Sequence, residues 1–178
     1  VDDLTERKSA TDGQVAATQT AAQRLSTEGG LDPVRGPALR VTLDDAPYNL
    51  PTIDRVSPDD LVVHQQDVQA VVNALWAGGA EAMMLQDQRV ISTSAVRCVG
   101  NTLILNGRTY GPPYTITAIG DVEGMRRGLD ESPGVAYYKE WVEAVHLGYK
   151  VEELPSTTLP GYNGSLRMQF ASVTDAGS

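Results

Sequence analysis

The stretch DVQAVVNALWAGGAEAMML, residues 67–85, decides the fold predicted for this chain. Its apolar residues recur at the spacing of one helical face: Val68, Val71, Val72, Leu75 and Trp76. The pair Gly78-Gly79 ends this helix, and residues 82–85 form a short apolar run typical of a buried strand. With a strand upstream, the stretch predicts a strand–helix–strand crossover, which is right-handed by the general rule for such units.

Segments on both sides of this crossover alternate or cluster apolar residues as strands do. The dipeptide Asn106-Gly107 predicts a tight hairpin turn. The strands expected are 38–43, 90–91, 95–99, 102–105, 108–110, 114–119 and 149–154, with a last edge strand at 166–170. Two further helices are expected at 122–129 and 135–146, and residues 155–164 are expected to be irregular.

Without the hairpin, the order of elements is βαββαβ, which is the order of a ferredoxin-like plait. We therefore predict an α+β fold. A plait domain with an inserted β-hairpin is expected over residues 36–172, preceded by an N-terminal stalk helix.

Residues 1–30 form this predicted helical stalk, which is rich in Ala, Gln, Thr and charged residues. Positions 4, 8, 11, 15, 18, 22 and 25 follow the alternating four-three spacing of a coiled coil, but Lys, Thr and Thr occupy three of them. These seven positions, the seam of a possible coiled coil, fit either a weak coiled coil or a solvated helix without a partner. Because the chain opens at Val1 inside what reads as a helix, we expect it to be a piece of a longer protein.

Composition excludes several classes of protein. The formal charge of −9 argues against binding to a nucleic-acid backbone, which requires Lys and Arg to neutralise phosphates. A single cysteine excludes an internal disulfide and a multi-cysteine zinc site. Apolar residues make up 41% of the chain and charged residues 21%, which is typical of a globular protein.

Catalytic and cofactor motifs are absent from the sequence. It contains neither a phosphate-binding glycine loop nor a nucleophile elbow, so we assign no catalytic residue and no cofactor. The pairs Asp44-Asp45 and Asp59-Asp60, with His64 and Asp67, could ligate a divalent cation. Their spacing fits no metal motif, and aspartates in a proline-rich loop usually form turns and caps, so no metal ligand is assigned.

A candidate surface for a partner or ligand comes from basic and aromatic residues beyond the crossover: Arg89, Arg97, Arg108, Tyr110 and Tyr114, together with Asp121. Arg97 lies in an apolar stretch and needs a carboxylate or carbonyl partner, for which Glu81 and Asp121 are the candidates. One interpretation is an internal ion pair that holds the hairpin. The other is a surface that grips a carboxylate of a peptide or of an envelope glycan fragment.

Matching segments run in order over roughly residues 36–155: 67–75, 77–82, 88–90, 94–97, 106–107, 112–116 and 118–121. In these segments the chain resembles the YlxW/YlxX-like family of uncharacterised bacterial proteins. The resemblance implies a single-pass membrane protein with a juxtamembrane helix and this domain outside the membrane. It also implies association with division and cell-envelope gene neighbourhoods, without an established catalytic activity.

We therefore expect a non-catalytic, extracytoplasmic interaction module, anchored in the cell membrane by a segment absent from this chain. Its expected role is in cell-envelope growth or division. The expected partners are other envelope or division proteins, with self-association through the stalk and no nucleic acid. Two alternatives stay open: a domain that binds a small molecule or peptidoglycan fragment, and a hydrolase that uses acidic residues.

Overall fold

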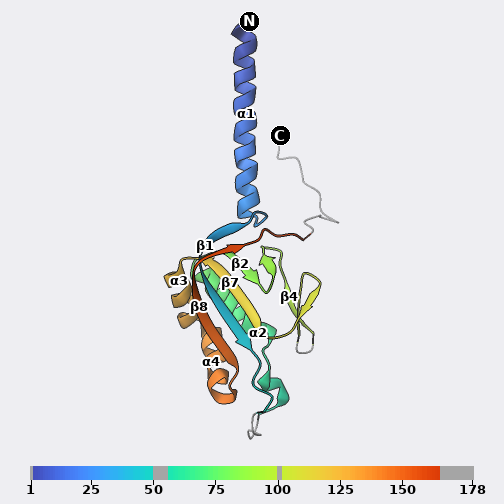
Figure 1. The fold of residues 1–178 in the computed structure, drawn as a ribbon, viewed down its shortest axis with the longest axis vertical. Helices are drawn as coiled ribbons and strands as arrows, with labels where there is room; N and C mark the ends of the chain where they lie inside the picture. The colour runs from blue at the N-terminus through green and yellow to red at the C-terminus, as the bar shows by residue number, and fades with distance from the viewer. Residues whose placement is uncertain (1, 50–55, 100–101, 165–178) are drawn as a thin grey trace, which may run out of the picture.

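The computed structural model describes residues 2–49, 56–99 and 102–164 (Figure 1). In chain order its elements are α1 (Asp2–Glu28), β1 (Val34–Asp44), the 3-10 helix η1 (Pro58–Leu61), α2 (Gln65–Ala77), β2 (Ala80–Leu85), β3 (Gln88–Val90), β4 (Val96–Val99), β5 (Thr102–Leu105), β6 (Arg108–Tyr110), β7 (Tyr114–Gly120), α3 (Val122–Glu131), α4 (Pro133–Val145) and β8 (Gly148–Leu159).

The strands form two antiparallel sheets in the described part of the chain. The larger sheet has five strands in the order β3-β2-β7-β1-β8, and the smaller has three in the order β4-β5-β6. With its four α-helices, this arrangement confirms the predicted α+β class. The predicted hairpin turn at Asn106-Gly107 is confirmed as the β5–β6 connection, but the inserted unit has three strands rather than two.

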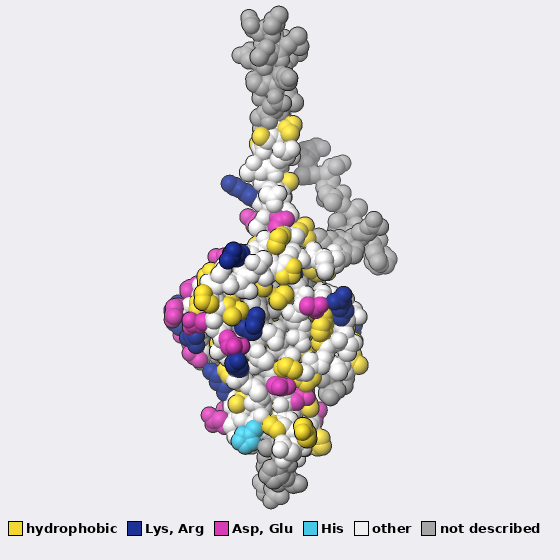
Figure 2. All heavy atoms as spheres, viewed as in Figure 1, with side chains coloured by type: hydrophobic (Ala, Val, Ile, Leu, Met, Phe, Trp, Pro, Cys, Tyr) yellow, Lys and Arg dark blue, Asp and Glu magenta, His cyan; other side chains and the backbone are white. Residues whose placement is uncertain are grey.

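One face of the larger sheet carries the main core. Leu39, Val41 and Leu43 of β1 are fully buried and pack with residues of α2, α3 and α4. The residues between them point to the opposite face because side chains alternate along a strand. There the Arg40 Nε donates to Thr117 Oγ1 at 3.4 Å. In the view of Figure 2, acidic and basic side chains are interspersed over the body and do not form one continuous charged patch.

Glycines let α2 and α3 approach each other closely at the C-terminal end of α2. A Cβ at Gly78 would lie 2.6 Å from the Cα of Met125, and a Cβ at Gly124 would overlap the carbonyl oxygen of Gly78. Such contacts leave no room for a side chain. The crossing therefore fixes where α2 lies on the sheet, and α2 forms one wall of the groove described below.

The strand β8 is longer than the sequence predicts. Residues 155–159 are not irregular, because they continue β8 and pair with the start of β1, with Leu159 opposite Val34. The register shifts between Gly36 and Ala38, at Pro37 of β1 and Pro155 of β8. The two strands are paired on both sides of this shift. The predicted edge strand at 166–170 lies outside the described residues.

The predicted stalk helix is present as α1, which projects away from the body (Figure 1). Side chains from Gln14 to Leu25 are exposed. The helix ends where the Gly29 N–H donates to the Leu25 carbonyl at 2.8 Å and Gly30 adopts a φ of 77°. None of the helices in the described residues is long and apolar enough to cross a membrane.

Candidate functional site

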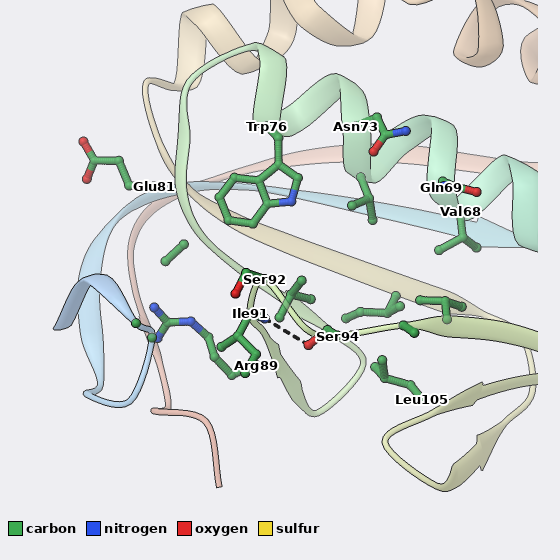
Figure 3. A pocket seen from close by; sticks show the side chains of 18 of the residues that line it. Val68, Gln69, Asn73, Trp76, Glu81, Arg89, Ile91, Ser92, Ser94 and Leu105 are labelled. Atoms are coloured by element: carbon green, nitrogen blue, oxygen red, sulfur yellow. Dashed lines mark hydrogen bonds between the residues drawn. The ribbon is translucent and has the colours of Figure 1, made fainter. Parts of the chain in front are cut away.

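A groove of about 680 Å³ lies between α2 and the segment that connects β2 to β4 (Figure 3). It extends from the base of α1 to the smaller sheet, because its lining includes both Gly30 and Leu105. Aliphatic residues form much of its surface: Val68, Val72, Leu85, Val90, Ile91 and Val96. Cavities of this size accommodate small ligands or short peptide segments.

The wall formed by α2 carries a row of polar side chains. Gln65, Gln69 and Asn73 recur every four residues, so they lie along one side of the helix. Figure 3 shows Trp76 at the end of the groove beyond Asn73. The Trp76 side chain is 39% exposed, which makes it one of the large apolar residues that the body does not cover.

Across the groove from α2, a tight turn forms the opposite wall (Figure 3). The Ile91 N–H donates to the Ser94 Oγ at 3.0 Å, and the Ser94 N–H donates to the Ile91 carbonyl at 2.9 Å. These two hydrogen bonds fix the turn between β3 and β4. The groove is therefore walled by a helix and a turn that are each held by local hydrogen bonds.

The sequence alone does not predict this groove, although one row of its lining residues is visible in it. The sequence pattern predicts the apolar face of α2 and places Trp76 on it. The amide residues Gln65, Gln69 and Asn73 form a second row at helical spacing beside that face. The row of amides is visible in the sequence, but the partial exposure of Trp76 and the opposite wall of the groove are not.

Arg89 is the one member of the predicted surface that lines the groove. Its side chain is buried, with 5% exposure, and its Nη1 donates to the carbonyls of Asp32 at 3.2 Å and Pro160 at 3.0 Å. Burial lowers the pKa of the guanidinium, because water no longer solvates the charge. Arg89 thus ties the end of the stalk and the end of β8 to the edge of the sheet.

Arg97 does not fill the role that the sequence suggests. Its side chain is exposed on β4, and no hydrogen bond or ion pair in the described residues joins it to Glu81 or Asp121. The expectation failed because β4 belongs to the smaller sheet, where alternate residues face solvent. The buried arginine of the region is Arg89 instead.

Arg108 and Tyr110 form a cluster with Asp87 at the surface of the molecule, where the Arg108 and Asp87 side chains are exposed. Both extend from β6 to Asp87, in the turn between β2 and β3: the Arg108 Nη1 lies 2.9 Å from Oδ2, and the Tyr110 hydroxyl donates to Oδ1. The hydrogen bond from Tyr110 is the main reason that the pKa of Asp87 is lowered. The cluster joins the smaller sheet to the larger one.

The last two residues of the predicted surface lie apart from the groove. Tyr114 is fully buried, and burial raises its pKa to about 12, so it offers no surface to a partner. Asp121 is exposed at the N-cap of α3, and its Oδ2 lies 3.9 Å from the Arg127 Nη2. The structure therefore does not bring the six predicted residues together.

The acidic residues near the 44–60 segment act as local hydrogen-bond acceptors. Asp45 accepts from the Val63 N–H at 2.8 Å, and Asp67 accepts from the His64 N–H at 2.8 Å. Burial is the main cause that raises the pKa of both carboxyls. Among the described residues, no group of three His, Cys, Asp or Glu side chains is placed to hold a metal ion.

A second, more open depression of about 570 Å³ lies between the end of α2 and α3. Glycine backbone from the helix crossing forms its floor, and Asp121 and Arg127 lie on its rim. Its apolar lining consists of two small side chains, Ala74 and Ala77, and it includes no aromatic residue. The groove beside α2 is therefore the better candidate for a binding site.

Comparisons with known proteins place the chain beside uncharacterised bacterial proteins. A family model described as a bacterial protein of unknown function, DUF881, matches residues 21–172. The curated protein "UPF0749 protein Rv1823" of Mycobacterium tuberculosis is 35% identical over 115 residues, which cover 62% of this chain and 38% of that protein. "UPF0749 protein YlxW" of Bacillus subtilis is 32% identical over 102 residues, covering 57% and 43%. The predicted resemblance is thus confirmed, and the chain spans less than half the length of these relatives.

A solved structure shares the fold. The crystal structure of an uncharacterized conserved protein from Mycobacterium tuberculosis superimposes with a TM-score of 0.62 at 25% sequence identity. The match covers 84% of this chain and 96% of that one. The arrangement of sheets and helices therefore recurs in a second protein.

Proposed function

Because the chain belongs to the DUF881 family of bacterial proteins of unknown function, we propose that it is a non-catalytic module that binds a protein partner in the groove beside α2. The full protein is anchored in the cell membrane by a segment outside this chain, with this domain on the extracytoplasmic side. Its partners are other proteins of envelope growth or division.

The groove is the observation that carries this proposal. It combines an aliphatic floor, a partly exposed tryptophan and amide side chains along one rim. Buried aromatic anchors surrounded by polar rims are typical of protein-binding sites. The charged groups elsewhere support the fold, since Arg89 binds carbonyls and Asp87 joins the two sheets.

The projecting helix supports the proposed placement at a membrane. A projecting helix of 27 residues extends about 40 Å at 1.5 Å per residue, enough to hold the body away from a lipid surface. We also propose that two copies associate through the stalk, because Val15 and Leu25 are exposed at seam positions.

The strand order also supports the finer fold class. Strands β8, β1, β7 and β2 lie in that order, each antiparallel to its neighbour, with helices connecting β1 to β2 and β7 to β8. We infer that these four strands form a ferredoxin-like plait, with β3 to β6 inserted between its second and third strands.

Photocrosslinking inside the native bacterium tests the proposed function. The full-length protein carries a benzophenone amino acid at Asn73 in the groove, and a matched variant carries it at Gln66, which is exposed on α2 outside the groove. We expect envelope or division proteins to be captured from Asn73 and not from Gln66. Equal capture from both positions would contradict the proposal, as would turnover of an envelope metabolite by the purified protein.

A peptidoglycan fragment is the second candidate occupant. Trp76 offers an exposed ring for stacking on a sugar, and Asn73 and Ser92 could bind its hydroxyl groups. Titration with a purified disaccharide-peptide of the cell wall distinguishes the two. Saturable binding that is lost in Trp76→Ala would favour the glycan over a protein partner.

A further inference from the structure

The amide row on α2 already binds one extended strand of this chain. The Gln65 Oε1 accepts a hydrogen bond of 2.9 Å from the backbone N–H of Cys98, in β4. This contact shows how a side-chain amide of α2 holds a strand that runs beside the helix. An extended chain can therefore lie along α2 beside its amide side chains. In this molecule β4 occupies only the part of that path next to Gln65.

The rest of this path is free in the described structure. Gln69 and Asn73 continue the row toward Trp76, and both side chains are exposed. Within residues 2–49, 56–99 and 102–164, no hydrogen bond uses either amide. Each amide can donate and accept, so each can bind both the carbonyl and the N–H of a peptide unit.

The spacing of the row suits an extended peptide. Four residues of an α-helix rise about 6 Å, and two residues of a strand rise about 6.8 Å. Successive amides on α2 therefore meet every second residue of an extended chain. Every second side chain of that chain would then face the aliphatic floor, which includes Val68, Val72 and Ile91.

One end of the groove carries two carboxylates, Glu28 and Glu81, and one buried guanidinium, that of Arg89, which already binds two carbonyls; the net negative charge that is left favours a basic residue. Glu28 and Glu81 line the groove, and both side chains are exposed. No ion pair in the described part of the chain involves either of them. Figure 3 shows Glu81 at the same end of the groove as Trp76, with its carboxylate at the outer rim and directed away from the ring. A long Lys or Arg side chain that passes over the exposed Trp76 ring, whose face attracts a cation, would reach toward this rim.

We propose that the groove binds an extended segment of a partner protein, with alternating apolar residues and a Lys or Arg at the Trp76 end. The inference rests on the proposed function and names the chemistry of the partner. Gln69 and Asn73 hold the backbone of the segment, the aliphatic floor takes its apolar side chains, and Trp76 with Glu81 receives the basic residue.

Fluorescence anisotropy with the full chain tests this inference. The probes are the labelled peptide acetyl-Lys-Thr-Val-Ser-Leu-Ser-Val-amide, its reversed sequence for the opposite chain direction, and versions with Glu in place of Lys. We expect saturable binding of at least one Lys peptide. The Glu version should bind about tenfold more weakly, because it lacks the cation that Trp76 and Glu81 attract.

Variants of the groove locate the binding. Asn73→Ala and Gln69→Ala should each weaken binding about fivefold through a lost hydrogen bond, and Trp76→Ala should weaken it about tenfold or more. All three positions are exposed, so the fold should be kept, which circular dichroism checks. Gln66→Ala is the matched control on the same helix and should bind like the parent chain.

Three outcomes would overturn the inference. The first is that neither Lys peptide binds, or that binding is the same in the three groove variants and in Gln66→Ala. The second is binding only after residues 165–178 are removed, which would assign the groove to the chain itself. The third is self-association that the groove variants abolish, which would assign the groove to a second copy. If the peptides fail while Asn73 still crosslinks to a protein in cells, the proposed function stands and only the peptide chemistry is wrong.

Discussion

Arg89 is a buried cation that two backbone carbonyls hold in place, and both belong to segments that end near the edge of the sheet. Its Nε is buried without a hydrogen-bond partner in the described residues. The side chain therefore stabilises the junction of Asp32 and Pro160 even though its own charge is poorly solvated. Its contribution to stability comes from satisfying these carbonyls.

Replacing Arg89 should destabilise the protein much more than replacing Arg97. Arg89→Ala leaves the carbonyls of Asp32 and Pro160 without a donor and should cost about 2–4 kcal/mol of unfolding free energy. Arg97→Ala removes an exposed side chain and should stay within about 0.5 kcal/mol. Urea unfolding of both variants measures the difference. Equal losses would contradict the assignment of Arg89 as the junction residue.

Tyr149 has a buried hydroxyl without a hydrogen-bond partner in the described structure, and burial raises its pKa to about 12. A raised pKa means that the folded state keeps a proton that the unfolded state loses from about pH 10. The stability this group contributes is therefore complete below about pH 10 and falls as the pH rises toward 12. Tyr149→Phe should keep its stability at neutral pH and decline less steeply in that window, which urea unfolding across the pH series measures.

Tyr138→Phe is the control for this effect at neutral pH. The Tyr138 hydroxyl donates to the Gly148 carbonyl at 2.9 Å, so its removal should cost about 1 kcal/mol. A loss of similar size in Tyr149→Phe would mean that the Tyr149 hydroxyl has a partner after all.

The sequence indicated a group of arginines between residues 89 and 108, but it did not correctly indicate which one is buried. The candidate arginines were Arg89, Arg97 and Arg108, but one sequence alone does not show which strand packs against the core. Arg97 was chosen because of its apolar neighbours, yet β4 lies in a small sheet with one solvated face. Burial of Arg89 depends on residues 32 and 160, which are far apart in the sequence and unpredictable from local pattern.

The crossing of α2 and α3 sets the position of the groove wall. Gly124 and Gly128 of α3 lie against backbone of α2, so neither position has room for a Cβ. Close helix packing of this kind depends on small residues at the contact. Any change that separates the two helices would therefore also move the row of amides on α2.

Gly124→Ala should destabilise the protein by about 1–3 kcal/mol, because the added methyl group overlaps the Gly78 carbonyl and the helices must separate. Gly111→Ala is the control, since a Cβ there meets no atom within 4 Å. Thermal unfolding of both variants measures the effect. Similar melting temperatures for the two would contradict the close crossing.

The helices and central strands of the body were predictable, because each has a strong local pattern. The apolar face of α2 and the turn signals Gly78-Gly79 and Asn106-Gly107 placed their elements correctly. The end of β8 was not predictable, because Pro155 argues against a strand and only the pairing with β1 overrides it. The groove also escaped prediction, since it needs α2 and the Ile91–Ser94 turn to face each other.

The described part of the molecule consists of a body and a long helix that projects from it and ends just before Gly30 (Figure 1). The Tyr162 N–H donates to the Gly30 carbonyl at 2.8 Å, which ties the helix end to the segment after β8. The same glycine lines the groove. The stalk and the binding groove therefore meet at one junction.

Self-association through the stalk predicts a mass that rises with concentration in sedimentation. The double variant Val15→Asp and Leu25→Asp places charges on the proposed seam and should stay monomeric. The control Ala16→Asp and Thr20→Asp carries the same charges on the other side of the helix and should associate like the parent chain. A parent chain that is monomeric at every concentration would contradict the prediction.

The most direct test of whether a partner protein occupies the groove is a competition experiment in permeabilised cells. The yield of the crosslink from Asn73 is measured while the Lys peptide that binds the purified chain is added. A peptide that occupies the groove should lower this yield in a dose-dependent way, while its Glu version should have little effect at the same concentrations. A yield from Asn73 that does not respond to the peptide, although the peptide binds the purified chain, would show that the partner does not occupy the groove.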